Sequence, residues 1–204
     1  MKRKIQMTMI LLMATQWLAA QENNKIYEAF IESYGLEATG NYSKSIEKIR
    51  EVYSDDSYDM NIRLGWLYYN LGNFPESEKY YQMTTKIFPY SIEAKLGYVL
   101  PLSGLGHWDK IIEVYFDILK IDPQNTLVNY RLGAIYYERK NYSKAYDYLE
   151  NVINLFPNDF DSVLLYAWTH FQTGKLKEAK VLFRKALLIK PNNASAQYGL
   201  SLIK

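Results

Sequence analysis

Few side chains in this 204-residue sequence combine a reactive type with a spacing that suits catalysis. The sequence has no cysteine, so a thiol nucleophile, a disulfide and a cysteine-bound metal are excluded. Its two histidines, His107 and His170, have no carboxylate or second histidine at ligand or triad spacing. The sequence also lacks GxxxxGK[ST], HExxH and GxSxG. We therefore predict that the chain is not an enzyme and binds no cofactor or metal.

The remaining candidates fit turns and packing better than chemistry. Gly104-Leu105-Gly106 is the nearest approach to a glycine-rich loop, but it stands between two segments with helical patterning. His107 follows it in the same turn, and His170 falls on a helix face. The elements that carry these residues must therefore be identified first.

The first twenty residues have the pattern of a secretory signal peptide. Three basic residues at 2–4 precede a largely apolar stretch at 7–17, and Leu18-Ala19-Ala20 stands before the polar Gln21. The apolar stretch is shorter than the ~20 residues that a membrane-spanning helix needs. We expect export to a periplasm or out of the cell, with cleavage after Ala20. An uncleaved anchor or an amphipathic start is the alternative.

Composition and charge favour a packed protein that does not bind nucleic acid. Apolar residues make up 49% of the chain, so a continuous core can be buried. The chain has 24 Lys and Arg against 22 Asp and Glu. The leader holds three basic residues and no acidic one, which leaves 21 against 22, a net charge of −1. A near-neutral chain without an evident basic cluster gives no support for nucleic-acid binding.

Four of the six prolines recur every 34 residues, at Pro89, Pro123, Pro157 and Pro191. Each ends a segment whose apolar residues follow a helical spacing, and a proline cannot continue such a helix. Repetition at this period indicates stacked structural units, each too small to bury its apolar face alone. The sequence therefore predicts an array of helix pairs.

Small and large residues recur on the same ruler when it starts at Tyr58, Ile92, Thr126 and Phe160. Small residues at positions 8 and 20 let two antiparallel helices approach closely, beside large ones at 17 and 24. Glycine or asparagine in the turns between them, as in Leu71-Gly72-Asn73 and Arg139-Lys140-Asn141, suits the left-handed backbone that ends a helix. Position 8 holds Gly65, Val99, Gly133 and Ala167, position 20 Ser77, Ile111, Ala145 and Ala179, position 17 Phe74, Trp108, Tyr142 and Leu176, and position 24 Tyr81, Tyr115, Leu149 and Phe183.

This pattern resembles the tetratricopeptide repeat family. The clearest copy runs from Asn129-Tyr130-Arg131-Leu132-Gly133 through Tyr136, Tyr142 and Ala145 to Pro157. The resemblance implies an all-α fold, a right-handed α-solenoid of stacked antiparallel helix pairs in which each repeat touches mainly the next.

The ruler divides residues 21–204 into one degenerate copy, four full copies and a closing helix. The degenerate copy, 26–57, lacks the proline and lies two residues too close to the next copy. The closing segment, 194–204, is expected to be a C-terminal capping helix. The full repeats are 58–91, 92–125, 126–159 and 160–193.

The copy at 92–125 departs from the pattern in its first helix. Pro101 removes the hydrogen bond to the carbonyl of Gly97, so we expect a kinked or broken helix there. Leu96-Gly97 also stands two residues early relative to Leu64-Gly65. Tolerated irregularity is favoured over a bend that reshapes a binding surface.

The resemblance implies that the first helices line a concave face that binds an extended peptide or a partner's helix. Positions 5, 9 and 12 form an apolar and aromatic stripe without charge, so a clamp for a terminal carboxylate is not predicted. The same rings could equally well pack between neighbouring first helices. The stripe contains Ile62, Trp66, Tyr69, Tyr130, Tyr137, Leu164, Trp168 and Phe171.

Two arginines, Arg63 and Arg131, occupy one register position two repeats apart. They could pair with an acidic partner. Surface charges usually contribute little, so solvated or locally paired arginines are the favoured interpretation.

Together these patterns predict an extracytoplasmic scaffold or adaptor that binds other proteins through its concave face. The expected partner is a protein or extended peptide with apolar or aromatic anchors. We expect no nucleic acid and no stable membrane insertion once the leader is removed. The alternatives are an accessory subunit of an envelope enzyme or secretion complex, and a structural protein that self-assembles through apolar surface on its closing helix.

Overall fold

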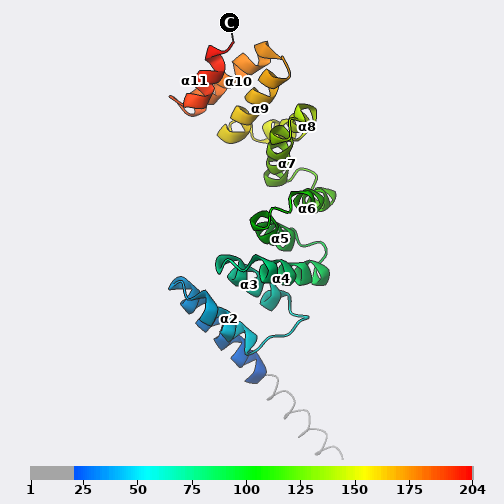
Figure 1. The fold of residues 1–204 in the computed structure, drawn as a ribbon, viewed down its shortest axis with the longest axis vertical. Helices are drawn as coiled ribbons and strands as arrows, with labels where there is room; N and C mark the ends of the chain where they lie inside the picture. Colours follow the sequence, from blue (N-terminus) through cyan, green and yellow to red (C-terminus); the bar gives the residue numbers. More distant parts are fainter. Residues whose placement is uncertain (1–20, 204) are drawn as a thin grey trace, which may run out of the picture. The chain divides into compact units, whose positions relative to one another are not determined.

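The computed structural model describes residues 21–203, which form helices joined by short turns and contain no strand (Figure 1). The predicted all-α repeat fold is confirmed. The expected leader, residues 1–20, lies outside the described residues. Among the residues described, no helix is both long and apolar enough to cross a membrane. The chain divides into two compact units, Met1–Ile111 and Ile112–Lys204, with the boundary inside α6 (Trp108–Ile121).

The first unit is built from helices that pack in chain order. An N-terminal helical segment, residues 21–38, is followed by the four helices that precede α6. Each of α2, α3 and α4 packs against the next, and α3 also touches α5. Their facing sides bury a core around Ile49, Leu64 and Leu67. The helices are α2 (Tyr42–Arg50), α3 (Tyr58–Asn70), α4 (Phe74–Ile87) and α5 (Ile92–Gly104).

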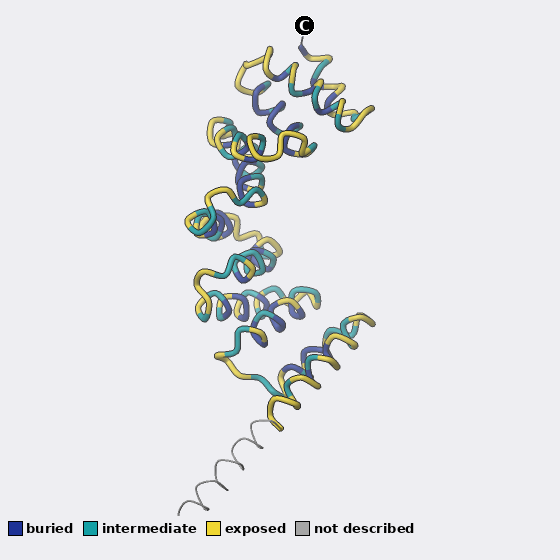
Figure 2. The backbone as a smooth tube through the Cα atoms, turned by 180° about the vertical axis from the view of Figure 1, so that it is seen from behind, coloured by how far each residue is buried: buried dark blue, intermediate teal, exposed yellow. Residues whose placement is uncertain are grey.

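The second unit repeats the same arrangement after α6. Each helix from α7 to α10 packs against the next, and α9 touches both α7 and α11. Buried residues follow the facing sides of these helices, whereas the turns are exposed (Figure 2). The core at its C-terminal end is formed around Phe183, Val163 and Ala186. The helices are α7 (Thr126–Glu138), α8 (Tyr142–Leu155), α9 (Phe160–Gln172), α10 (Leu176–Ile189) and α11 (Ala194–Ser201).

Polar residues at the helix starts explain why the register is kept. The first residues of α3, α5, α7 and α9 are the four register starts of the sequence ruler. The residue before each is a serine, asparagine or aspartate whose side chain accepts a hydrogen bond from a backbone N–H of the first turn. These N-cap residues are Ser57, Ser91, Asn125 and Asp159.

In the turns within the repeats, glycine is left-handed as expected at Gly72, whereas in Arg139-Lys140-Asn141 the left-handed residue is the lysine and not the asparagine. Asn73 and Asn141 have negative φ and act as N-caps of α4 and α8. The left-handed residue comes one position earlier, at Gly72 and at Lys140. Asparagine is more useful as a cap here because its side chain satisfies an otherwise unpaired N–H at the start of the next helix.

Of the two outcomes expected at Pro101, a kinked or a broken helix, the broken helix is wrong. Helix α5 is continuous through Pro101 to Gly104 and has 13 residues, as α3, α7 and α9 have. Pro101 lies only three residues from the helix end and is buried, so packing compensates for one missing hydrogen bond. The backbone N–H of Leu105 still donates to the Pro101 carbonyl at 2.9 Å, which closes the final turn.

The early glycine in α5 has a packing reason. A Cβ atom at Gly97 would lie 2.2 Å from Cε1 of Tyr81, the large residue of the preceding repeat. The opposite edge of the same ring lies against Gly65, where a Cβ would be 2.8 Å from Cδ2. The Tyr81 ring therefore fits between α3 and α5 only because both helices carry glycine beside it.

Candidate functional site

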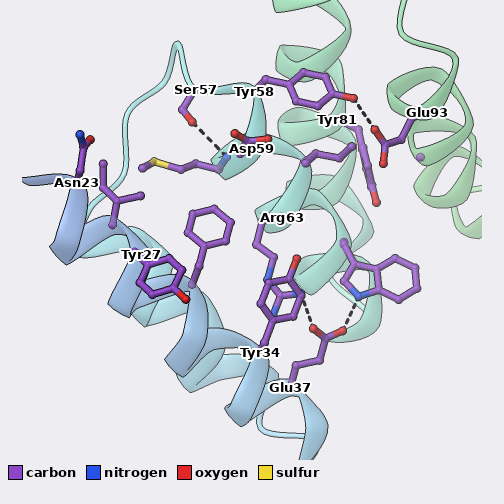
Figure 3. A pocket seen from close by; sticks show the side chains of 16 residues that line it. Asn23, Tyr27, Tyr34, Glu37, Ser57, Tyr58, Asp59, Arg63, Tyr81 and Glu93 are labelled. Atoms are coloured by element: carbon purple, nitrogen blue, oxygen red, sulfur yellow. Dashed lines mark hydrogen bonds and ion pairs between the residues drawn. The ribbon is translucent and has the colours of Figure 1, made fainter.

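A groove of about 940 Å³ lies in the first unit, lined by the N-terminal helical segment 21–38, α3 and α5 (Figure 3). These elements are the first helices of three successive copies of the repeat. The groove therefore occupies the face that the sequence resemblance assigned to partner binding.

Exposed aromatic rings form the walls of this groove. On the N-terminal segment, Tyr27 is 68% exposed and Tyr34 is 57% exposed. From α3, Trp66 is 39% exposed. Tyr58 is half-buried, and the buried Tyr81 contributes to the lining beside α5. Large aromatic side chains that remain accessible in a hollow are typical anchors for a protein partner.

A polar cluster joins the N-terminal segment to α3. The Glu37 carboxylate forms an ion pair with Nη1 of Arg63 and accepts a hydrogen bond from Nε1 of Trp66 (Figure 3). Nε and Nη2 of Arg63 donate to Oγ of Ser33 at 3.1 and 3.0 Å. The guanidinium carbon lies 3.8 Å from the ring centroid of Tyr34. These contacts hold Arg63 and Trp66 in place before any partner arrives.

A second polar contact joins α3 to α5. The Tyr58 hydroxyl lies 2.9 Å from Oγ of Ser91 and donates to Oε2 of Glu93 at 3.0 Å. Burial raises the pKa of the Tyr58 hydroxyl, so it stays protonated and keeps this donor role.

The groove carries more negative than positive charge. The positive charge of Arg63 is matched by Glu37, and the further acidic lining residues are Asp59 and Glu93. Asp59 is exposed to solvent. A partner segment with a positive charge is therefore favoured over one with a negative charge.

The structure places the four sequence-predicted residues of α3 beside or near this groove. Ile62, Arg63 and Trp66 line it, and Tyr69 packs between Trp66 and Phe74 with ring centroids 6.2 and 5.8 Å away. Arg63 is buried and its donors are taken by Glu37 and Ser33. Local pairing, the interpretation favoured from the sequence, therefore describes Arg63.

The sequence-predicted residues of the second unit have other surroundings. Trp168 of α9 packs edge-on against Phe171 and Phe183, and its Nε1 donates to Oγ of Ser195 at 2.9 Å. Leu164 packs against the buried core. Tyr137 packs edge-on against the ring of Tyr142.

Two further predicted residues, Tyr130 and Arg131, lie on α7. Tyr130 lines a separate hollow of about 330 Å³, and Arg131 is exposed. The structure thus brings α3 residues together at one groove, whose lining includes no residue of α7 or α9.

Sequence reasoning missed the groove residues of the degenerate copy, Tyr27, Tyr34 and Glu37. They could have been found by placing the degenerate copy 32 residues, and not 34, before the copy that starts at Tyr58. The Ser45 hydroxyl donates to the Ser33 carbonyl at 2.8 Å, as the Ser77 hydroxyl donates to the Gly65 carbonyl at 2.7 Å. When the two copies are aligned on these contacts, Tyr34 occupies the repeat position that Trp66 occupies in the next copy.

The histidines show no catalytic arrangement. His170 is buried between the rings of Tyr146 and Tyr166, with centroids 5.3 and 4.5 Å away, and its Nδ1 has no hydrogen-bond partner. His107 is exposed, with Nδ1 3.8 Å from Oε2 of Glu78. Within residues 21–203, no group of three or more His, Asp or Glu side chains could hold a metal ion.

Comparison with known sequences identifies the repeats. Two family models described as tetratricopeptide repeat match residues 32–92 and 137–203. BBSome complex member BBS4 of Bos taurus is 26% identical over 158 residues, which cover 77% of this chain and 30% of that protein. The chain therefore spans less than a third of the length of this relative.

Comparison with solved structures gives the same fold. A tetratricopeptide repeat protein from Parabacteroides merdae ATCC 43184 superposes with a TM-score of 0.76 at 17% identity, covering 88% of this chain and 72% of that chain. The crystal structure of MamA protein superposes with a TM-score of 0.72 at 16% identity, covering 82% and 93%. At such low identities the likeness concerns the fold alone.

Proposed function

This chain belongs to the tetratricopeptide repeat family, and we propose that it is a non-catalytic scaffold that binds an extended segment of another protein in the groove of its first unit. The observation that carries the proposal is the set of accessible rings of Tyr27, Tyr34 and Trp66 around one hollow. A chain that leaves such rings exposed in a concave site has surface available for a partner's apolar side chains.

The chemistry of the groove narrows the class of partner. Aromatic walls favour aliphatic or aromatic anchors, and rings of tyrosine and tryptophan also attract cations. Asp59 and Glu93 add negative charge that Arg63, already paired with Glu37, does not cancel. We therefore propose a partner segment with apolar side chains and at least one lysine or arginine.

The proposal includes an extracytoplasmic location, supported by the signal-like pattern of residues 1–20. Cell fractionation followed by mass spectrometry of the N-terminus tests it. The expected result is a chain that begins at Gln21 and is found outside the cytoplasm. A cytoplasmic chain that retains Met1 would contradict this part of the proposal and leave the groove unaffected.

The groove is tested by in-cell cross-linking and affinity capture with matched variants. A Tyr27→Ala, Trp66→Ala variant removes two accessible groove rings, and a Tyr137→Ala, Trp168→Ala variant removes two stripe rings of the second unit. We expect a captured partner to be lost from the first variant and retained by the second, with both variants helical by circular dichroism. Equal capture by wild type and the groove variant would place binding elsewhere.

Charge selectivity has its own test. Asp59→Asn removes one exposed negative charge from the lining of the groove. A synthetic peptide from the captured partner should bind this variant roughly two- to fivefold more weakly, since a partly exposed charge pair contributes up to about 1 kcal/mol. Unchanged binding would remove the cationic residue from the proposal and keep the apolar anchors.

A further inference from the structure

The outer face of α10, in the second unit, leaves aliphatic side chains in solvent. Val181 is 64% exposed and Leu188 is 83% exposed. The opposite face of the same helix buries Ala179, Phe183 and Ala186 in the core. The core packing of α10 therefore uses only that face, and it does not explain why Val181 and Leu188 are exposed aliphatic residues.

The other repeats show that these two positions normally carry polar side chains. Val181 and Leu188 occupy positions 22 and 29 of the 34-residue ruler. At these positions α4, α6 and α8 have exposed charged or amide residues, so α10 is the exception among the four second helices. The equivalent residues are Lys79, Glu113 and Asp147 at position 22, and Lys86, Lys120 and Asn154 at position 29.

The same helix concentrates positive charge, which corrects the expectation from the sequence that the chain has no evident basic cluster. Residues 175–190 contain six Lys and Arg residues and a single acidic residue, Glu178, a net charge of +5. The rest of the chain after the leader then holds 15 basic and 21 acidic residues, a net charge of −6. The near-neutral total conceals two regions of opposite sign.

The cations of this helix are not used in ion pairs. Among the described residues, the recorded salt bridges involve no side chain of α10. Lys175 and Lys190, at its two ends, lie over the rings of Tyr146 and Phe160, with Nζ 4.3 and 5.0 Å from the centroids. Lys177 and Arg184 are exposed between them.

Charge and aliphatic surface meet in one shallow hollow of about 750 Å³. Val181 and Leu188 line it together with Arg184 and Lys185 of the same helix. A ligand that fits must therefore present negative charge next to hydrocarbon.

We propose that this face of α10 binds the surface of a membrane containing anionic phospholipids, with Val181 and Leu188 entering the boundary between headgroups and acyl chains. A helix with several Lys and Arg residues beside a narrow apolar strip suits such a surface. An acidic protein is less favoured, because protein interfaces are enriched in aromatic residues and arginine and depleted in lysine. Residues 175–190 hold five lysines and one arginine, and the one aromatic residue of α10, Phe183, is buried in the core.

Vesicle co-sedimentation tests this surface. The full-length chain and the chain beginning at Gln21 are mixed with vesicles of phosphatidylcholine alone or of phosphatidylcholine with phosphatidylglycerol. We expect binding of both chains to the anionic vesicles, with little binding of the shorter chain to the neutral ones. Soluble glycerol phosphate should not compete, because a bilayer presents many headgroups together with its hydrocarbon.

Two variants of the chain beginning at Gln21 separate the charged and apolar contributions. Lys177→Gln, Arg184→Gln, Lys185→Gln should weaken binding to anionic vesicles by roughly 100-fold, from about fivefold per cation near such a surface. Val181→Ser, Leu188→Asn should weaken it by roughly tenfold with no change in charge. Both sets change exposed or half-exposed side chains, and circular dichroism checks that the variants stay helical.

The matched control removes three cations from the same outward positions of other repeats, with Lys79→Gln, Lys86→Gln, Lys120→Gln. It changes the net charge by the same amount and should retain wild-type binding. No binding of the wild-type chain beginning at Gln21 to anionic vesicles would overturn the proposal. Equal losses from the control and the α10 variant would also overturn it. Binding of poly-glutamate but not of vesicles would assign this face to an acidic protein instead.

Discussion

Trp66 and Trp168 occupy the same register position in the two units, and the structure uses them in opposite ways. Trp66 stands at the wall of an open groove and is held by Glu37 from the copy before it. Trp168 lies against Phe183 and Tyr198 and is held by Ser195 from the helix after it. The position in the repeat places a ring on the same side of each first helix, but the neighbouring copy decides whether it remains accessible.

The two ends of the array explain this difference. The N-terminal segment 21–38 presents Tyr27 and Tyr34 to the groove and leaves them exposed. At the other end, Ala196 and Gly199 of α11 are buried, and a Cβ at Gly199 would lie 2.3 Å from Cζ of Phe183. Close approach of α11 therefore brings Tyr198 beside Trp168, and that tryptophan becomes part of the cap.

The largest expected effect is the difference in stability between alanine variants of the two tryptophans. Trp168→Ala removes a ring that packs on the buried Phe183, so we expect the free energy of unfolding to fall by about 3 kcal/mol. Trp66→Ala removes a more exposed ring and should lower it by about 1 kcal/mol. Urea denaturation followed by circular dichroism measures both. Equal losses would mean that Trp66 is a packing residue and would weaken the groove proposal.

The two arginines at one register position give the next contrast. Arg63→Met leaves the Glu37 carboxylate without its partner in a largely buried place and should lower the free energy of unfolding by about 2 kcal/mol. Arg131 is exposed, so Arg131→Met should change it by less than about 0.5 kcal/mol. In a double-mutant cycle, Arg63→Met should cost less free energy of unfolding in the Glu37→Gln background than in wild type. Additive effects of the two substitutions would show that the Arg63–Glu37 pair is energetically unimportant.

The sequence predicted the repeating core better than it predicted the groove. The 34-residue spacing of the prolines and of the packing positions gives the helix starts. Small residues stand at positions 8 and 20 in three of the four full copies, whereas the copy at 92–125 has Val99 and Ile111 there. Tyr34 and Glu37 belong to the copy that lacks proline and is offset by two residues, so the ruler did not reach them. The cluster around Glu37 also depends on side chains 26 and 29 residues apart in sequence, which no local pattern indicates.

The kink or break expected at Pro101 shows the same limit. Helix propensity favours a break at an interior proline, but a buried site near the helix end overrides it. The glycine two residues early looked like a loss of register. It is a consequence of Tyr81 in the preceding repeat, whose ring needs space on α5. Packing between copies, which decides both features, cannot be read from one copy alone.

His170 should make the stability of the second unit depend on pH. Burial lowers the pKa of His170, and Lys175 lowers it further, against weaker opposite effects of Glu178 and Glu150. As pH falls through about 6.5, the unfolded chain therefore binds a proton that the folded chain does not. The free energy of unfolding should then fall on acidification below about pH 6.5.

The matched variant for this effect is His170→Tyr, since α3 and α7 carry Tyr68 and Tyr136 at the same position. It keeps an aromatic ring and removes the titrating group. Urea denaturation at several pH values above the range of the carboxylates should show a smaller pH dependence than in wild type. An unchanged dependence would assign the effect to another group.

The smallest expected effect concerns the turns of the two units. The turn before α4 has Gly72 in the left-handed conformation, whereas the turn before α8 has Lys140, with φ of 59°. A left-handed backbone costs a residue with a Cβ roughly 1 kcal/mol, and glycine avoids this cost. Glycine also makes the unfolded chain more flexible, which offsets part of the resulting stabilisation. Lys140→Gly should therefore raise the free energy of unfolding by about 0.5 kcal/mol. The reciprocal Gly72→Lys should lower it by about 1 kcal/mol, because a Cβ at Gly72 meets no atom within 4 Å and only the backbone conformation opposes it. If both substitutions lowered stability, the lysine side chain of Lys140 would be contributing contacts that outweigh its strained backbone.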